Sequence, residues 1–184
     1  SSAASDVDKR QVLQHYFLPQ IKIDRLDEKN TQEAPYKQWR DRGLLTVCEG
    51  SRVNYSEVTD WFVQMQQEYE IDPIFIGYDR ALAGYWVDEM KSNGFQMEAV
   101  AQGPFTWSQP MREMGAALAD KKVNYNNNPI LKWCLTNTGV KKSGLNNIQP
   151  VKINERRRID GAVSLLNAWV LYVKYYEDFM YSVG

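Results

Sequence analysis

The stretch Ile74-Phe75-Ile76-Gly77-Tyr78-Asp79 decides the fold of this 184-residue chain. Its residues do not alternate between apolar and polar, which is typical of a strand buried on both faces in a parallel sheet. A helix is predicted to follow from about Ala81 to Lys91, with Asn93-Gly94 as its stop. Residues 95–100 then alternate like another strand. The order strand, helix, strand predicts a right-handed α/β arrangement.

The residues before this stretch predict two more strands and a helix. Residues 12–18 are rich in β-branched and aromatic side chains, and Pro19 closes that strand. A loop or short helix is expected over residues 24–34, and a second strand over Gly43–Cys48. Apolar residues at helical spacing then predict a helix over about 56–70, packed on a sheet.

The residues after it predict three helices and a hairpin. Residues 103–108 are interpreted as a loop that leads into a helix over 109–121, and Pro129 is placed to start a short helix through Leu135. Two extended runs between Val140 and Ile153 surround Ser-Gly and Asn-Asn turn residues, which indicates a basic β-hairpin. A long apolar stripe predicts a final helix over about 160–176.

The composition fits one compact domain over residues 1–184, with 43% apolar and 24% charged residues. Lys and Arg number 22 against 23 Asp and Glu, so any DNA site must be local rather than a property of the whole chain. No apolar run reaches the length that spans a bilayer, and the first residues lack the pattern of a signal peptide. We therefore expect a cytoplasmic chain without a membrane partner. Cys48 and Cys134 lie in apolar surroundings and are expected to be buried free thiols.

Two aspartates stand where chemistry is expected. Asp79 ends an apolar strand, and open α/β sheets place their ligand sites at the carboxyl ends of such strands. Asp160 begins the final helix and is predicted to share a polar edge of it with Ser164 and Asn167. A plainer explanation is open for both, because acids at helix starts cap the helix or interact with its dipole.

These two acids together could bind one or two divalent cations. Magnesium prefers hard oxygen ligands and keeps several of its waters, so a few carboxylates at one edge of a sheet suffice. Two such metals can activate a water and stabilise the leaving oxygen when a phosphodiester bond is cut. This chemistry does not require the bases to be read.

Cationic residues cluster on the hairpin and before the final helix, and they are candidate DNA contacts: Lys141, Lys142, Lys152, Arg156, Arg157 and Arg158. A solvated charged face explains the same cluster equally well. Three tryptophans could stack on bases, although packing is the commoner role, namely Trp39, Trp107 and Trp133. The single histidine, His15, is placed inside the first strand and is given no role. The chain has no phosphate-loop motif, and no Ser, Cys and His set predicts a catalytic triad.

Six short motifs, in order along the chain, resemble the C-terminal nuclease domain of tailed-phage terminase large subunits. They are Tyr16-Phe17-Leu18-Pro19, Pro35-Tyr36-Lys37-Gln38-Trp39, Gly43-Leu44-Leu45, Gly77-Tyr78-Asp79-Arg80, Asn128-Pro129-Ile130-Leu131-Lys132-Trp133 and Arg158-Ile159-Asp160-Gly161-Ala162-Val163. The resemblance implies a ribonuclease-H-like fold, with a mixed central sheet flanked by helices. It also implies an endonuclease that uses Mg or Mn, with two ions, and makes the cuts that start and finish genome packaging.

By this resemblance, Asp79 and Asp160 match the second and third acidic positions of the family's metal site. The first position has no match, because Asp6 and Asp8 lie where a hairpin turn is expected. We therefore expect a sheet that lacks its first strand, and a chain without the ATPase half of the motor. The partners implied are double-stranded DNA, the terminase small subunit, the portal protein and the terminase ATPase domain, in the host cytoplasm.

Two other functions are consistent with the same residues. One is a ribonuclease-H-like module of weak or absent catalysis that docks other parts of the packaging motor. The other is a related enzyme, such as a junction resolvase or a transposase, which would share the carboxylates but not the six motifs.

Overall fold

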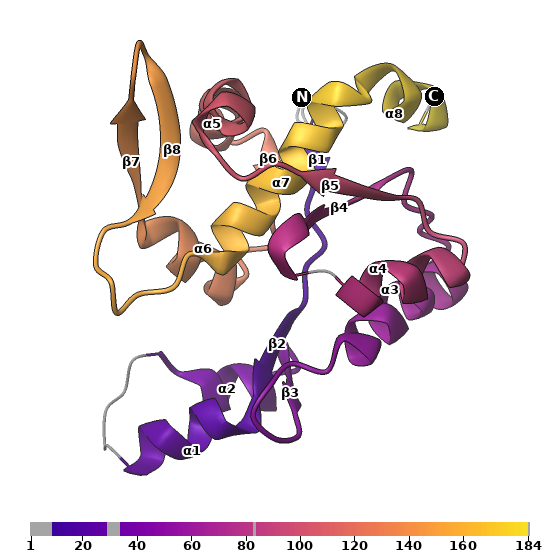
Figure 1. The fold of residues 1–184 in the computed structure, drawn as a ribbon, viewed down its shortest axis with the longest axis vertical. Helices are drawn as coiled ribbons and strands as arrows, with labels where there is room; N and C mark the ends of the chain where they lie inside the picture. Colours follow the sequence, from indigo (N-terminus) through magenta and orange to yellow (C-terminus); the bar gives the residue numbers. More distant parts are fainter. Residues whose placement is uncertain (1–8, 29–33, 83, 184) are drawn as a thin grey trace, which may run out of the picture. The chain divides into compact units, whose positions relative to one another are not determined.

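The computed structural model describes residues 9–28, 34–82 and 84–183, and Figure 1 shows their mixed α/β architecture. Asp6 and Asp8 lie outside the described residues. The contacts divide the chain into two compact units. Unit 1 comprises the described residues up to His15 and Gly103–Trp169, and unit 2 comprises Tyr16–Gln102 and the described residues from Val170 onward.

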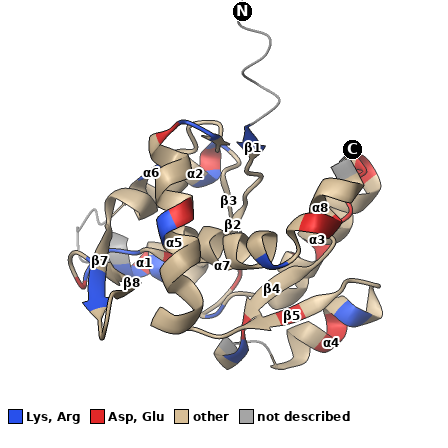
Figure 2. Cartoon of the chain, turned by 90° about the horizontal axis from the view of Figure 1, so that it is seen from above, with Lys and Arg blue, Asp and Glu red and all other residues tan. Residues whose placement is uncertain are grey.

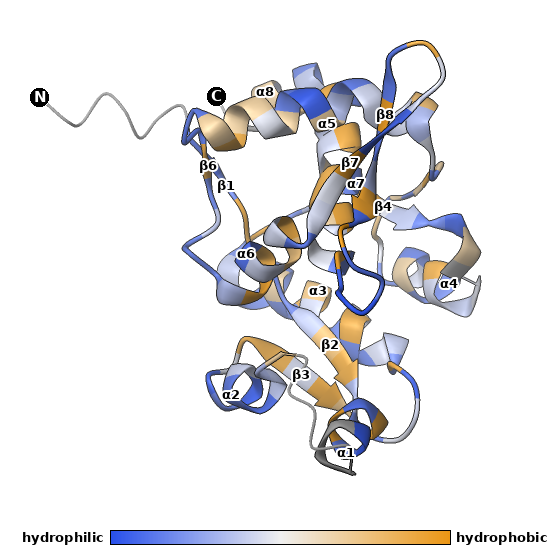
Figure 3. Cartoon of the chain, turned by 90° about the vertical axis from the view of Figure 1, so that its left-hand side faces the viewer, coloured by the Kyte–Doolittle hydropathy of each residue, from blue (hydrophilic) through white to orange (hydrophobic). Residues whose placement is uncertain are grey.

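Unit 2 contains two parallel strand pairs. Strand β2 (Tyr16–Pro19) pairs with β3 (Leu45–Cys48), and β4 (Ile76–Asp79) pairs with β5 (Met97–Val100). Figure 3 shows that β2 and β3 are strongly apolar. The helices of this unit are α1 (Gln20–Glu28), α2 (Tyr36–Asp41), α3 (Tyr55–Tyr69), the short 3-10 helix η2 (Arg80–Leu82), α4 (Gly84–Ser92) and α8 (Tyr176–Val183).

The core of unit 2 forms between α3, α4 and the β4–β5 pair. Ile76, Met90 and Phe95 are buried together, and Phe62 and Val63 of α3 pack against them. Helix α3 starts where the Asn54 side chain accepts a hydrogen bond from the Ser56 amide, as expected of an N-cap. This packing fixes the strand that ends at Asp79.

Unit 1 contains the remaining strands and most of the long helices. Strand β1 (Arg10–Gln11) pairs in parallel with β6 (Val123–Asn124), and β7 (Thr138–Ser143) forms an antiparallel hairpin with β8 (Asn147–Lys152). The helices are α5 (Pro104–Ala119), α6 (Pro129–Thr136) and α7 (Asp160–Lys174), whose last turn belongs to unit 2.

Buried side chains join the helices of unit 1. The Trp107 indole N–H of α5 donates to Asn167 Oδ1 of α7 at 3.0 Å, and both residues are buried. The Arg10 guanidinium lies 5.5 Å from the ring centre of Trp169, a cation–π contact that holds β1 on α7. Asn128 caps α6 by accepting hydrogen bonds from the amides of Ile130 and Leu131.

Several sequence-based boundaries need correction. Residues 103–108 are not a loop, because α5 already begins at Pro104, a residue suited to the first helical position. His15 is not inside a strand, since it lies between β1 and β2. Within the described residues the strands pair two by two, rather than in one continuous central sheet. No helix in the described part of the chain is both long enough and apolar enough to cross a membrane.

Candidate functional site

Asp79 is the last residue of β4 and is half-buried, in unit 2. Its Oδ1 atom accepts a hydrogen bond from the Ala81 amide at 2.9 Å, so the side chain caps the turn that follows the strand. Its second carboxylate oxygen accepts no hydrogen bond from the described residues. The capping role is therefore present, and one oxygen of a fixed carboxylate is left for another partner.

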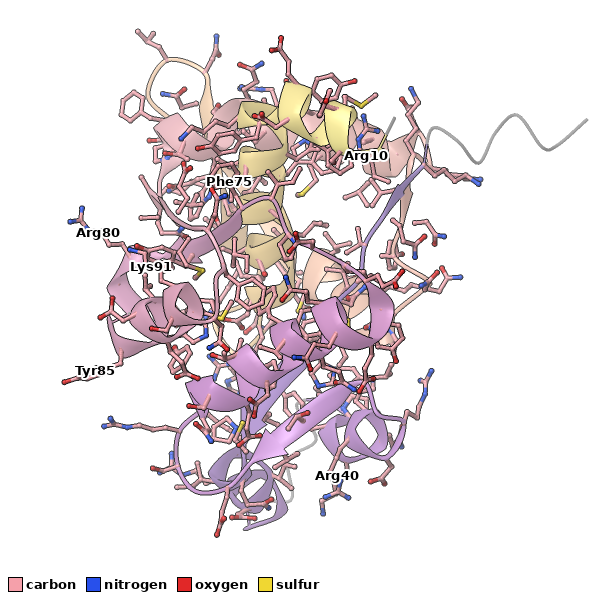
Figure 4. All side chains as sticks on the ribbon, turned by 90° about the vertical axis from the view of Figure 1, so that its right-hand side faces the viewer. Arg10, Arg40, Phe75, Arg80, Tyr85 and Lys91 are labelled. Carbon is pink, nitrogen blue, oxygen red and sulfur yellow. The ribbon has the colours of Figure 1, made fainter. Side chains whose placement is uncertain are left out.

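A cation and an aromatic side chain follow Asp79 at the surface of unit 2. Arg80 is exposed, and Tyr85 at the start of α4 is 95% exposed. Figure 4 shows both side chains extending away from the ribbon. Sequence reasoning assigned no role to either residue.

Asp160 is the first residue of α7 and is exposed, whereas Ile159 before it is buried. It stands in the first helical turn, where its charge interacts favourably with the helix dipole. Buried Cys134 of α6 lies beneath this helix start. Burial raises the pKa of the Cys134 thiol and the Asp160 charge raises it further, against hydrogen bonds from the Gly161 and Ala162 amides.

The polar edge predicted for α7 is only partly present. Ser164 is exposed, but Asn167 is 8% exposed and accepts the Trp107 indole N–H. The helical period placed Asn167 on a solvent edge because it takes no account of α5, which covers that edge. Trp107 is thereby committed to packing, as is Trp39, which is 4% exposed, so neither offers a ring to a base.

The candidate DNA contacts all belong to unit 1, as Asp160 does. Figure 2 shows the basic stretch on β7, and the side chains of Lys141, Lys142 and Lys152 are exposed. Before α7, the side chain of Asn154 accepts a hydrogen bond from the Arg156 amide, and the backbone carbonyl of Asn154 accepts one from the Arg157 amide. This turn fixes the backbone of Arg156 and Arg157 ahead of Asp160, and Arg158 is the most covered of the three arginines.

The cysteines are buried free thiols as expected from the sequence, whereas the histidine lies outside the strand expected for it. Burial lowers the pKa of His15, which favours a neutral ring. Cys48 and Cys134 are both free and buried.

The donor chemistry suits a hard divalent cation. Asp79 offers carboxylate oxygens at the end of a strand, and Asp160 offers them at the exposed start of a helix. Magnesium completes its coordination shell with water. Among the described residues, no group of three or more His, Cys, Asp or Glu side chains is arranged to hold a metal.

Comparison with known proteins identifies the family. The model of the terminase large subunit endonuclease domain matches residues 5–174. Protein YmfN of Escherichia coli strain K12 is 26% identical over 149 residues, which are 79% of this chain and 32% of that protein. The crystal structure of the HK97 bacteriophage large terminase is similar with a TM-score of 0.73 and 22% identity, over 84% of this chain and 32% of that one.

These comparisons confirm the mixed α/β, ribonuclease-H-like fold class expected from the sequence. The chain spans only about a third, 32%, of the length of each of these two relatives. The family match covers most of the chain and includes both aspartates. The chain therefore belongs to the terminase large subunit endonuclease domain family.

Proposed function

We propose that this chain is a divalent-metal-dependent endonuclease that cuts double-stranded viral DNA during genome packaging. Membership of the terminase endonuclease domain family carries this proposal. The half-buried carboxylate of Asp79 and the exposed carboxylate of Asp160 support it, because they offer the oxygen donors that Mg or Mn requires. We further propose that the chain acts together with an ATPase domain, a small subunit and a portal protein, as the family implies.

Each side chain has a distinct part in this proposal. The Ala81 amide orients the Asp79 carboxylate and leaves its second oxygen for a cation. Asp160 presents its carboxylate at the exposed start of α7. When bound, divalent cations polarise the phosphodiester and lower the pKa of a bound water. Some of the lysines and arginines of unit 1 neutralise phosphates without reading bases.

A nicking assay on supercoiled plasmid with manganese tests the proposal. The informative variants are Asp79→Asn and Asp160→Asn, because asparagine still accepts the capping hydrogen bond of Ala81 but carries no charge. We expect each variant to reduce the nicking rate by at least about 100-fold. Mutating even a residue that only hydrogen-bonds to a metal ligand lowers metal affinity or activity by about 10- to 100-fold. Asp88→Asn, an exposed acid of α4 in the same unit as Asp79, is the matched control and keeps full activity.

Unchanged nicking in the Asp79→Asn, Asp160→Asn double variant would refute the assignment of these ligands. If the unaltered chain is folded but never nicks DNA with manganese or magnesium, the docking module is the better description. Thermal unfolding of each variant shows whether a loss of nicking is instead a loss of fold.

A further inference from the structure

The two faces of the β7–β8 hairpin carry different residues. In an antiparallel pair, directly opposite residues point to the same face, and successive residues alternate between faces. The register pairs Lys142 with Ile148, Val140 with Pro150 and Thr138 with Lys152. These six residues form one face, which we name the lysine-pair face. The opposite face is formed by Gly139, Lys141, Ser143, Asn147, Gln149 and Val151.

The lysine-pair face is the more open of the two. Val140 is 60% exposed, and Lys142 and Lys152 beside it are exposed as well. On the opposite face, only Lys141 is exposed. At the base of that face, a Cβ at Gly139 would lie 3.0 Å from the Ile153 side chain.

Helix α5 holds the hairpin through two residues, Ser108 and Arg112, which we name the α5 clamp. The Ser108 hydroxyl, on a side chain that is 6% exposed, accepts hydrogen bonds from the Ile148 amide at 3.1 Å and from Arg112 Nη1 at 2.9 Å. Arg112 Nη2 donates to the carbonyl of Asn146 in the hairpin turn. Figure 1 shows β8 running beside α5. The hairpin is therefore fixed in unit 1, and its two faces are not interchangeable.

The chemistry of the lysine-pair face fits a polyanionic backbone. Residues 138–152 include three lysines and no acid. Lys142 and Lys152 are four residues apart along the ladder, about 13 Å at the usual rise of a strand. The residues between them, Val140 and Pro150, are uncharged and offer no groups that read a base edge. A DNA duplex presents regularly spaced phosphates over such a distance.

We propose that the hairpin contacts the phosphate backbone of duplex DNA through the lysine-pair face, with Lys142 and Lys152 but without Lys141. This inference deepens the proposed nuclease function and depends on it for the choice of DNA as partner. The α5 clamp fixes the hairpin in unit 1, so the two faces cannot exchange places.

The test measures duplex binding by fluorescence anisotropy at several salt concentrations. The parent is the 184-residue chain with Asp79→Asn and Asp160→Asn, so that DNA is bound but not cut. Loss of one phosphate contact reduces the slope of log affinity against log salt by about 0.9. Lys142→Ala and Lys152→Ala are each expected to show this reduction. Between 50 and 200 mM salt, each variant then loses about 3.5-fold less affinity than the parent.

Two matched variants separate the face from the charge. Lys141→Ala removes the same charge from the neighbouring position and is expected to leave the slope unchanged. Lys142→Arg keeps the charge on the lysine-pair face and is expected to keep the parent slope. Equal reductions for Lys141→Ala and Lys142→Ala, or none for Lys142→Ala and Lys152→Ala, overturn the proposal.

The two proposals fail in different ways. If the unaltered chain binds duplex with the expected lysine pattern but does not nick plasmid, the lysine-pair face stands and the nuclease function falls. If it nicks plasmid but all three lysines contribute alike, the nuclease function stands and the one-sided contact falls.

Discussion

The two strand pairs that carry the candidate chemistry are built in different ways. The parallel pair β4–β5 ends at Asp79, and its Ile76 and Val100 are only 6% and 3% exposed. The antiparallel pair β7–β8 carries the lysines, and its Val140 is 60% exposed. Side chains pack on both sides of the β4–β5 pair. The β7–β8 pair is held to its unit largely along one edge, by the α5 clamp.

A glycine in each pair shows what this difference means. A Cβ at Gly77 would lie 2.9 Å from Leu171 Cδ1 and 3.0 Å from Val100 Cγ2. A Cβ at Gly139 would meet Ile153 Cγ2 at 3.0 Å, but Ile153 is 64% exposed and can move into solvent. Asp79 is thus positioned by a packed core in which an added methyl group finds little room. The hairpin lysines are positioned by surface strands whose neighbouring side chains can move aside.

The largest effect is expected from Leu171→Ala. Leu171 is 6% exposed and lies against Gly77, so its truncation leaves a cavity beside β4. We expect the free energy of unfolding to fall by about 2–5 kcal/mol, measured by urea unfolding. Val140→Ala on the hairpin is the comparison and should change it by less than about 0.5 kcal/mol. Similar losses in the two variants would contradict the contrast between the strand pairs.

A smaller but more specific effect is expected from the two glycines. Gly77→Ala overpacks the contact with Leu171 and Val100 and should lower the free energy of unfolding by about 1–3 kcal/mol. Gly139→Ala should stay within about 0.5 kcal/mol, because Ile153 is free to move aside. Combining Gly77→Ala with Leu171→Ala should cost less than the sum of the single changes, since the new methyl group enters the space that leucine vacates.

A pH-dependent effect is expected at Glu98 of β5. Burial opposes ionisation of this carboxyl, but hydrogen bonds from Lys174 Nζ at 2.5 Å and from the Tyr175 hydroxyl outweigh it. The pKa of Glu98 is therefore lowered from its usual 4.5. A lowered folded pKa gives stability that is fully present above about pH 4.5 and is lost as pH falls through the folded pKa.

Glu98→Gln tests this dependence. The difference in unfolding free energy between the unaltered chain and the variant should be constant at neutral pH and shrink below about pH 4.5. The pKa of Lys174 is raised from 10.5 by its hydrogen bonds to Glu98 and Tyr175, so its contribution is lost only at more alkaline pH. A difference that does not change with pH would contradict the lowered pKa.

Local sequence patterns were enough to predict the elements that depend on local spacing. The helix expected over 56–70 is α3 at Tyr55–Tyr69, and the hairpin expected between Val140 and Ile153 is β7–β8. The strand that ends at Asp79 was also predicted, and so was the capping role of that acid. Periodicity and capping are properties of neighbouring residues, so one sequence contains them.

Contacts between distant segments were not predictable in the same way. Asn167 was placed on a solvent edge, yet it is buried because the Trp107 indole, 60 residues away, satisfies its side chain. The α5 clamp joins Ser108 to Ile148 across 40 residues, and no local pattern marks that hydrogen bond. That Asp79 and Asp160 bind metal ions together involves residues still further apart in the sequence, and it stays a prediction.

The smallest effect is expected at the tip of the hairpin, where Leu145 is 98% exposed. The turn is formed by its neighbours, because Gly144 and Asn146 both adopt positive φ, at 57° and 73°. Leu145→Ser should therefore change the free energy of unfolding by less than about 0.5 kcal/mol. Gly144→Ala is the contrast, since an alanine in that conformation costs about 1–2 kcal/mol. If Leu145→Ser lowers the free energy of unfolding as much as Gly144→Ala does, then the hairpin tip is packed. The contrast between the exposed hairpin and the packed β4–β5 pair would then be wrong.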